Sequence, residues 1–479
     1  MTSPAATLRY RTLADDLAGR IHRGVLKPGD KLPSVRELCR LHEASPATVN
    51  HALHLLEDAG LLEARPRSGF YVRRQIRQLA APQQQAREQP PQVIALAEHR
   101  RLAVEFHRHG HQDCLGRAVI DPDFYPTQAL QRLMNQAARR DPSLLARILF
   151  DGGDTALRHQ LARRSVLLGC DWQADEILIT HGDTEATALC LRVLTQPGDI
   201  VAIQSPSHIA LLNLLDTLGL QVLEVPAHPV DGLQPETLAA ALANNQVAAC
   251  VLSSNFPNPT GSLMSVEAKR QIVAFLAERG IPLIEEDNFG ELYFGERRPP
   301  PYKAFDQAGD VLYCVDLSTL VGMGMGLGCA VTGRYRLAFE YAQFSASEPP
   351  SPLLQRTLAN FMESGQFEPH LRRLRQALAD NVVAHRNAVA EHFPAVTRVA
   401  ESRGGYLLWL ELPRGLDTAE LQRRALQHDI RFAPGHFFSH DQSFRNCLRL
   451  NAGYRLTPAI EADIATLGRL TAELLAESQ

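Results

Sequence analysis

The chain has 479 residues, of which 45% are hydrophobic and 21% are charged, and its formal net charge is -4. This length exceeds that of one ordinary domain and predicts two or three. No basic and apolar signal segment opens the chain, and no charge-free apolar run of about 20 residues predicts a membrane span. Because the eight cysteines include no CxxC pair, we expect a cytoplasmic protein with reduced thiols and no membrane partner.

Charge is distributed unevenly along the chain. Residues 1–74 hold 12 Lys and Arg against 8 Asp and Glu, whereas the remainder holds 37 against 45. A basic head on an acidic body indicates that the head meets nucleic acid. Lysine is rare, because the chain has only four and none follows Lys303.

The head has the pattern of a winged helix-turn-helix. Apolar residues at helical spacing predict a first helix that ends at Gly24. Ser34, with a glutamate three residues on, forms a capping box for a second helix, and Ser45 followed by Pro46 begins a third. Residues 61–74 predict a strand, a basic turn and a second strand.

The N-terminal end of that third helix exposes polar side chains where a recognition helix meets base edges and phosphates. Arginines on the second helix and on the hairpin can neutralise phosphates. The alternative is a small protein-binding winged helix with a solvated, charged face. The candidate DNA contacts from this pattern are Arg36, Ser45, Thr48, Asn50 and Arg67.

The head resembles the DNA-binding domain of the GntR family over residues 8–73, through the elements "LPSVREL", "SPATV" and "LEARPRSGFYV". The resemblance implies double-stranded DNA as partner and adds Gly69, at the tip of the wing, to Arg36, Ser45 and Thr48 as DNA contacts. Pro46 departs from the family, which often has arginine there, so one phosphate contact of the family is missing.

Residues 75–112 predict a linker, because residues 75–92 are rich in Gln, Pro and Ala and have no sustained apolar period. Four histidines and a cysteine lie in or just after it, and a metal site is one reading of them. Their spacings match no common zinc site, so we interpret the segment as packing against the next domain and predict no metal. These residues are His99, His107, His109, His111 and Cys114.

The body, residues 113–479, alternates apolar strand patterns with helical ones and predicts a parallel sheet with helices on both faces. The last part, from about residue 365 to 479, predicts a smaller α/β lobe with one long helix and two strands. Ligand sites in such sheets lie at the carboxyl ends of the strands, so the segments that follow them converge on one cleft. The strands are expected at 176–180, 199–205, 220–226, 247–254, 281–287 and 311–318.

These segments resemble the fold-type I aminotransferases, which depend on pyridoxal phosphate (PLP). Together with the head, the whole chain resembles a MocR-type transcriptional regulator. In the motifs "NFPNPTG", "CLRLNAG" and "SPSHIA", Asn258 matches the residue that bonds the cofactor's phenolic oxygen. Arg449 matches the clamp for a substrate carboxylate, and His208 matches the ring that stacks on the pyridine. Gly182 opens the phosphate cup. A structural salt bridge is the alternative role for Arg449.

Other positions depart from the family pattern. In "DLSTLVGMGMGLG", Thr319 falls on the Schiff-base lysine and Gly326 on the phosphate-binding arginine. Glu286 and Phe289 fall on the aspartate and tyrosine that hold the cofactor ring. Asp183 lies in the phosphate cup, where like charges about 5 Å apart cost roughly 3 kcal/mol per charge. A Schiff base needs an amine at the site, so we predict no catalytic residues.

The sequence therefore predicts a dimeric DNA-binding regulator that binds paired half-sites. Its aminotransferase-like body senses a small carboxylate-bearing effector, such as an amino acid, and binds no PLP as an aldimine. Three alternatives stay open. PLP or pyridoxamine phosphate binds without a covalent bond, held by Asn258 and Glu286. The pocket is empty and the protein is a constitutive scaffold. The chain is an aminotransferase with a fused DNA-binding head.

Overall fold

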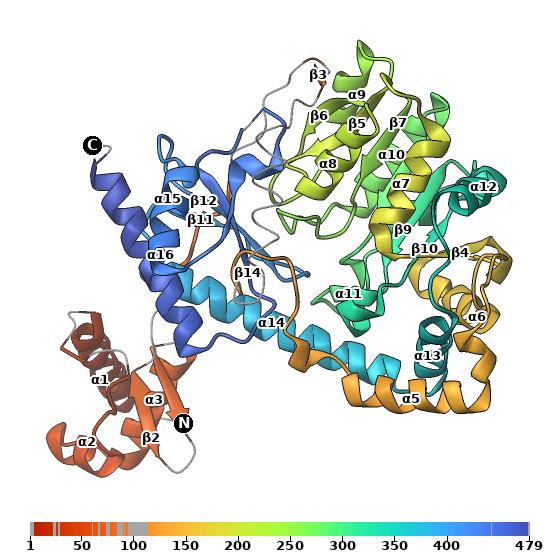
Figure 1. The fold of residues 1–479 in the computed structure, drawn as a ribbon. Helices are drawn as coiled ribbons and strands as arrows, with labels where there is room; N and C mark the ends of the chain where they lie inside the picture. Colours follow the sequence, from red (N-terminus) through yellow and green to blue (C-terminus); the bar gives the residue numbers. More distant parts are fainter. Residues whose placement is uncertain are drawn as a thin grey trace. The chain divides into compact units, whose positions relative to one another are not determined.

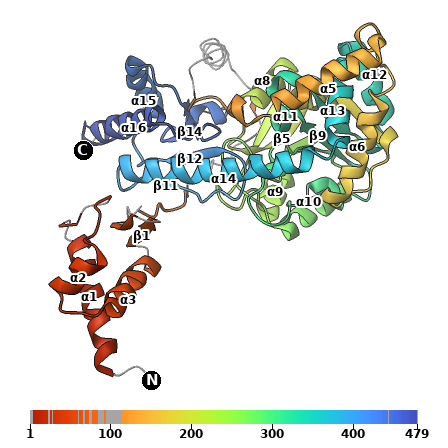
Figure 2. The same cartoon turned by 90° about the horizontal axis from the view of Figure 1, so that it is seen from below.

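The computed structural model describes residues 4–22, 25–26, 29–59, 61–65, 68–72, 77–83, 90, 92–93, 114–441 and 443–477. The chain divides into two compact units, Met1–Gln78 and Leu79–Gln479 (Figures 1 and 2). Among the described residues, no helix is long and apolar enough to cross a bilayer.

The head is a winged helix-turn-helix, as predicted. The Ser34 capping box begins α2, and the Ser45 hydroxyl accepts a hydrogen bond from the Thr48 amide at the start of α3. The apolar face of α3 is almost fully buried, and it packs on α1 and on the antiparallel strand pair of the wing. The elements are α1 (Pro4–His22), α2 (Val35–Leu41), α3 (Pro46–Asp58), β1 (Leu62–Arg65) and β2 (Gly69–Val72).

The body is built on an eight-stranded sheet of order β3-β6-β5-β7-β8-β9-β10-β4. Strands β5 to β9 are parallel and β4 runs in the same direction, so the parallel arrangement predicted for the six expected strands is confirmed. Strands β3 and β10, which are not among the expected strands, pair antiparallel with their neighbours and make the sheet mixed. Strand β10 follows β9 through a segment too short for the crossover that a parallel neighbour needs. The strands are β3 (Gln92–Val93), β4 (Ile177–Thr180), β5 (Ile200–Ser205), β6 (Gln221–Pro226), β7 (Ala249–Leu252), β8 (Leu283–Glu286), β9 (Val311–Asp316) and β10 (Gly328–Val331).

Helices cover both faces of this sheet, as predicted (Figure 1). Successive residues of β9 show the two faces, because Leu312 and Cys314 pack into one apolar cluster while Tyr313 and Val315 pack into another. The first face carries α7 (Gly182–Leu194), α8 (Ile209–Thr217) and α12 (Arg336–Ala346). The second carries α9 (Pro235–Ala243), α10 (Val266–Glu278), α6 (Thr155–Ser165) and α13 (Pro352–Glu363), with α5 (Thr127–Arg140) against α13.

The C-terminal lobe has a four-stranded antiparallel sheet of order β11-β12-β14-β13 and its own apolar core. The predicted long helix is α14, which packs against the last helix, α16. The elements are α14 (Phe367–His392), β11 (Arg398–Val399), β12 (Leu407–Glu411), α15 (Thr418–Ala425), β13 (Ala433–Pro434), β14 (Cys447–Asn451) and α16 (Pro458–Glu477).

The described parts of the predicted linker attach to the body. Leu79 is buried in the core of the lobe, and the Ala80 carbonyl accepts a hydrogen bond from the Val399 amide. Strand β3 adds an edge to the large sheet. The four histidines singled out in the sequence lie outside the described residues.

Candidate functional site

The carboxyl ends of β4, β7, β8 and β9 surround a cavity of about 170 Å³, which we call the sheet-edge cavity. This volume far exceeds the 10–15 Å³ that one water needs on this measure. Strand β4 runs in the same direction as β9, because both are antiparallel to β10 between them. The cavity therefore lies where the sequence predicted the cleft.

The structure brings most of the predicted pocket residues together. Six of them line the sheet-edge cavity: Asp183, His208, Asn258, Glu286, Phe289 and Thr319. His208 and Asn258 also line an adjoining cavity of about 200 Å³ next to the small lobe, the lobe cavity, together with Arg449. Gly182 and Gly326 are outside both linings.

The predicted phosphate cup is the first turn of α7. Gly182 begins this helix with a φ of +75°. The backbone of Gly328 on β10 passes so close that a Cβ atom at 328 would lie 2.5 Å from the Gly182 carbonyl carbon. Asp316, at the end of β9, faces the same turn, because a Cβ atom at Gly182 would lie 3.6 Å from Asp316 Oδ1. The sequence analysis missed Asp316, although its place directly after a buried strand was a usable signal.

Two carboxylates flank this turn, that of the partly exposed Asp183 and that of the buried Asp316, and their hydrogen bonds come from neutral groups. Asp183 Oδ2 accepts from Asn288 Nδ2 at 2.5 Å, and Asp316 Oδ2 accepts from the Thr319 hydroxyl at 2.6 Å and from its amide. Burial and the carboxylates of Glu286 and Asp316 raise the pKa of Asp183 to about 6. Burial also raises the pKa of Asp316.

A third carboxylate, that of Glu286 at the end of β8, pairs with an imidazole. His208 caps α8, and its Nε2 lies 2.9 Å from Glu286 Oε2. Burial alone would raise the pKa of Glu286, but His208 and the Thr187 hydroxyl outweigh it and lower that pKa. Burial likewise disfavours a charged His208, but the carboxylates of Glu286 and Asp183 outweigh it and raise the pKa of the imidazole.

The loop between β9 and β10 holds the two positions that we predict to stand in place of the lysine and the arginine. Thr319 lies in the short helix α11 (Ser318–Val321) and is buried, with its hydroxyl turned to Asp316. Gly326 is exposed in the left-handed conformation, with φ +57°, and a Cβ atom there would meet no atom within 4 Å. The room around Gly326 is thus open.

The lobe cavity carries guanidinium groups. Arg449 on β14 is 5% exposed, donates to Asn258 Oδ1 at 3.0 Å, and also donates to the Gly116 carbonyl. Its guanidinium lies 5.5 Å from the ring centre of Phe438. Arg117, which the sequence analysis did not single out, lines the same cavity.

The head places its candidate contacts near the start of α3 and on the wing. Arg36 and Asn50 are exposed, Ser45 is exposed at the N-cap, and Thr48 is half-buried with its hydroxyl 2.8 Å from that of Ser45. Gly69 begins β2 with a φ of +109°, a conformation that favours glycine. Arg67 lies outside the described residues.

Both units match known families. The model described as "Bacterial regulatory proteins, gntR family" matches residues 9–72, and that described as "Aminotransferase class I and II" matches residues 123–458. An uncharacterized HTH-type transcriptional regulator of Escherichia coli, YdcR, is 33% identical over 98% of this chain and 100% of its own length. The chain belongs to the HTH-type transcriptional regulators that join a gntR domain to an aminotransferase class I and II domain.

Other relatives of this regulator include both regulators and enzymes. The HTH-type transcriptional regulator TauR of Rhodobacter capsulatus is 28% identical over 93% of each chain. Among solved structures, the α-aminoadipate aminotransferase LysN of Thermus thermophilus, complexed with N-(5'-phosphopyridoxyl)-L-leucine, matches with a TM-score of 0.71 and 26% identity. The match covers 78% of this chain and 95% of that one.

Beside the cavity lies a buried ionic network that the sequence analysis did not foresee. Lys269 on α10 is fully buried, and its Nζ donates to Asn255 Oδ1 at 2.6 Å and to the Pro300 carbonyl at 2.8 Å. Asn255 in turn donates to Asp287, which pairs with Arg298. No sequence signal could have found this network, because it joins residues from separate strands and loops.

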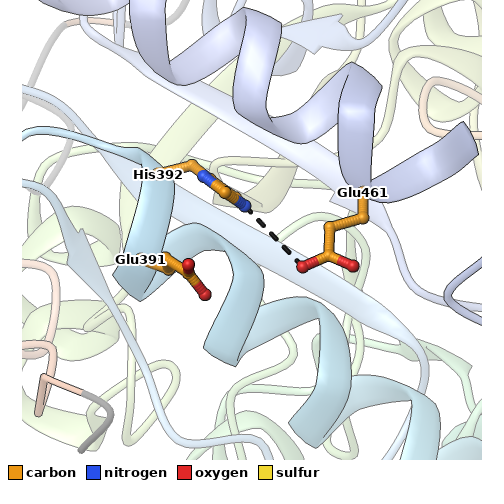
Figure 3. A group of neighbouring side chains, drawn as sticks. All are labelled: Glu391, His392 and Glu461. Atoms are coloured by element: carbon orange, nitrogen blue, oxygen red, sulfur yellow. Dashed lines mark ion pairs between the residues drawn. The ribbon is translucent and has the colours of Figure 1, made fainter. Parts of the chain in front are cut away.

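One group among the described residues has metal-ligand spacing. Glu391, His392 and Glu461 have ligand atoms within 4.8 Å of one another, between α14 and α16 (Figure 3). His392 Nε2 lies 3.8 Å from Glu461 Oε1. Glu391 is exposed and the other two are partly exposed, and exposed acidic groups are common without an ion. We assign no metal to them.

Proposed function

We propose that this regulator uses its aminotransferase-like body as a catalytically inactive sensor and dimer platform. The observation that carries this proposal is the buried contact between the Thr319 hydroxyl and the Asp316 carboxylate, at the position matched to the Schiff-base lysine. A hydroxyl in that place cannot form an imine with an aldehyde. The proposal goes beyond the family match, since relatives of this chain include aminotransferases.

The described lysines offer no substitute amine. Among the described residues, no lysine lines either cavity. Lys269 is held by Asn255 and the Pro300 carbonyl. Lys303 is held by Asp306 at 2.8 Å and by the Val311 carbonyl. Imine formation and proton transfer therefore both lack the agent that the chemistry requires.

The cofactor that this fold normally serves, PLP, does not fit the residues present. Its phosphate would lie at the first turn of α7, where two carboxylates, Asp183 and Asp316, face the space and the position matched to arginine is Gly326. Like charges at about 5 Å cost roughly 3 kcal/mol each at an effective dielectric of about 20. We therefore derive no chemical step through this cofactor.

We propose that the head contacts DNA through the start of α3, α2 and the wing. Arg36 supplies a phosphate contact, while Ser45, Thr48 and Asn50 present polar groups at the helix start that a recognition helix turns to the major groove. Gly69 allows the wing backbone to approach the duplex closely. Arg67, on sequence grounds, adds a second phosphate contact.

We propose that the body dimerises through an apolar face of α12. Leu337 is 79% exposed and Tyr341 and Phe344 lie on the same side of the helix, both largely exposed. Phe150 meets Phe344 with ring centres 5.7 Å apart and extends the face. Leu145 and Ile148, which precede Phe150 in the chain, are also exposed. Contiguous exposed apolar surface of this kind marks protein contact sites. A second copy of the chain would place two heads on paired half-sites.

Effector binding would then act by favouring one spacing of the two heads. The carboxylate of the effector would bind Arg449, whose planar guanidinium suits bidentate contact. Effector binding would also explain why the body keeps a formed cavity although it has no imine-forming group.

The proposal that the body is catalytically inactive is tested in two steps. An absorbance spectrum of the purified protein is recorded, and the protein is then treated with borohydride in the presence of added PLP. We expect no visible aldimine band and no cofactor fixed by reduction. A stoichiometric aldimine would overturn the proposal. The double variant Thr319→Lys with Gly326→Arg is the positive control. An aldimine band in this variant, and none in the wild-type protein, would support the match of these positions to the lysine and arginine of PLP enzymes.

A further inference from the structure

The two adjoining cavities of the body have opposite charge. The sheet-edge cavity is lined by three carboxylates, those of Asp183, Glu286 and Asp316. The lobe cavity is lined by the guanidinium groups of Arg117 and Arg449 and by no carboxylate among the described residues. The cavities share four wall residues: Ala118, His208, Ala210 and Asn258. One ligand can therefore span both.

The hydrogen-bond donors to two of these carboxylates are neutral groups. Asp183 bonds the amide of Asn288, and Asp316 bonds the hydroxyl and amide of Thr319 and the amide of Ser318. The His208 imidazole pairs with Glu286 at 2.9 Å and also acts on Asp183. Among the described residues that line the sheet-edge cavity, no other can carry positive charge, so three carboxylates share one imidazole. Buried carboxylates are stable when a cation pairs with them. The cup that holds a phosphate dianion in PLP enzymes is thus built here for a positive group.

The arrangement suits an ammonium better than a metal ion. Among the described residues, the only group with ligand atoms mutually within 4.8 Å is that of Glu391, His392 and Glu461 in the small lobe (Figure 3). The carboxylates of the sheet-edge cavity are therefore spread too widely for three of them to ligate one ion. An ammonium has three donors that point in different directions and can satisfy separated acceptors.

We propose that the joined cavities bind an amino acid with a second, distal ammonium group, a diamino carboxylic acid. Its carboxylate pairs with Arg449, and its distal ammonium lies between Asp183 and Asp316 at the first turn of α7. This inference rests on the proposed role of the body as an effector sensor and names the chemical class of that effector. On this proposal, the first turn of α7 binds a cation and excludes the phosphate anion that the same turn binds in PLP enzymes.

The two-cavity arrangement requires the second ammonium to lie at the end of the ligand's side chain. The α-ammonium of any amino acid stays next to its carboxylate, and it would lie near the shared wall at His208 and Asn258. Only an amine at the end of a side chain can enter the carboxylate-lined cavity while the carboxylate stays on Arg449. A ligand with net charge +1 also leaves less uncompensated negative charge than a neutral amino acid.

The inference is tested by measuring the binding of a matched set of probes to the full-length protein, using thermal shift and titration calorimetry. L-lysine and L-norleucine have the same chain and differ in the distal ammonium, L-glutamate places a negative group there, and cadaverine lacks the carboxylate. We expect L-lysine or the shorter L-ornithine to bind at least tenfold more tightly than L-norleucine, with no shift from L-glutamate, PLP or inorganic phosphate. Equal binding of L-lysine and L-norleucine, tighter binding of PLP or phosphate, or no binding of either diamino acid at millimolar concentration would overturn the inference.

Variants locate the ammonium. Asp183→Asn and Asp316→Asn should each reduce the L-lysine to L-norleucine affinity ratio about tenfold, since the amide keeps a hydrogen-bond acceptor but loses the charge. Asp231→Asn is the control, because Asp231 is a surface carboxylate of the same unit with 61% side-chain exposure. Arg449→Gln should weaken both amino acids and leave cadaverine unchanged. An unaltered ratio in both aspartate variants would contradict the assignment, and the wild-type ratio stands as a test if a variant fails to fold.

A parallel DNA-binding assay separates this inference from the proposed function. If the probes fail but the protein binds DNA and forms no aldimine, the inactive-regulator proposal stands and the effector class is wrong. If an aldimine forms with PLP, both are wrong.

Discussion

The head and the body of this regulator depend on their functional residues in different ways. In the head, a candidate contact is also part of the fold, because the Ser45 hydroxyl caps α3, the helix that we propose meets DNA. In the body, the sheet is held by apolar strands and by close backbone contacts such as that of Gly182 with Gly328. We propose that Thr319 and Gly326 replace residues of the cofactor chemistry, and a formed cavity lies beside Thr319. On that proposal, the fold outlasts its chemistry because the two depend on different residues.

Breaking the backbone contact in the body should give the largest effect. In Gly328→Ala, the new Cβ atom would lie 2.5 to 2.6 Å from the backbone of Gly182, which cannot move aside as a side chain can. We expect a loss of about 3 kcal/mol or more in the free energy of unfolding, measured by thermal or denaturant unfolding. Gly324→Ala in the same loop is the control, because a Cβ atom there meets nothing within 4 Å. Equal stability of the two variants would show that the close approach does not hold the cup.

Removing the Asp183 charge from the cup should raise the free energy of unfolding, whereas Gly328→Ala should lower it. The raised pKa of Asp183, about 6 against an ordinary 3.8, means that the folded state binds this proton more tightly than the unfolded state. Stability is then lost as pH rises from about 4 to 6, and the full penalty remains above 6. Asp183→Asn should therefore stabilise the ligand-free protein by about 2 to 3 kcal/mol at pH 8.

The pH dependence of that gain is the decisive part. At pH 4.5 the gain should fall to less than half of its value at pH 8, because the folded protein then holds the proton in any case. The groups that face Asp183 are Glu286, Asp316, His208 and Asn288, and Asp231→Asn controls for loss of a surface charge. A gain that is independent of pH, or a loss at pH 8, would show that Asp183 is compensated in the fold.

The sequence predicted the body's strands and long helix well, because buried strands are continuous apolar runs bounded by turns. It did not predict that β10 runs antiparallel, since strand direction depends on the connection in space. It identified Glu286 and His208 separately but not their 2.9 Å pairing, because the two residues are far apart in the chain. The role of Asp316 could not be read from the sequence, because its approach to Gly182 joins two segments that are far apart in the chain.

In the head, removal of a charge should affect DNA binding without affecting the fold. Arg36 is exposed on α2. We expect Arg36→Ala to weaken DNA binding about 10- to 30-fold and to reduce the slope of log affinity against log salt by about 1, measured by fluorescence anisotropy at several salt concentrations. Arg423→Ala is the control, because this exposed arginine of the small lobe pairs with Glu420. An unchanged salt slope would remove Arg36 from the phosphate contacts.

Substitutions of Ser45 should give the smallest effect, and they distinguish its role as a helix cap from its role as a DNA contact. Ser45→Ala removes the acceptor of the Thr48 amide, so α3 should lose about 1 kcal/mol, seen as roughly fivefold faster hydrogen exchange of the α3 amides in the full-length protein. Ser45→Asp restores a capping oxygen and should restore that protection, yet its negative charge should repel phosphate and leave DNA binding impaired. Ser68→Ala controls for loss of a hydroxyl in the wing, where Ser68 bonds Tyr71 and not α3. If Ser45→Asp restored both protection and DNA binding, Ser45 would act only through the fold, and head and body would differ less than their residues indicate.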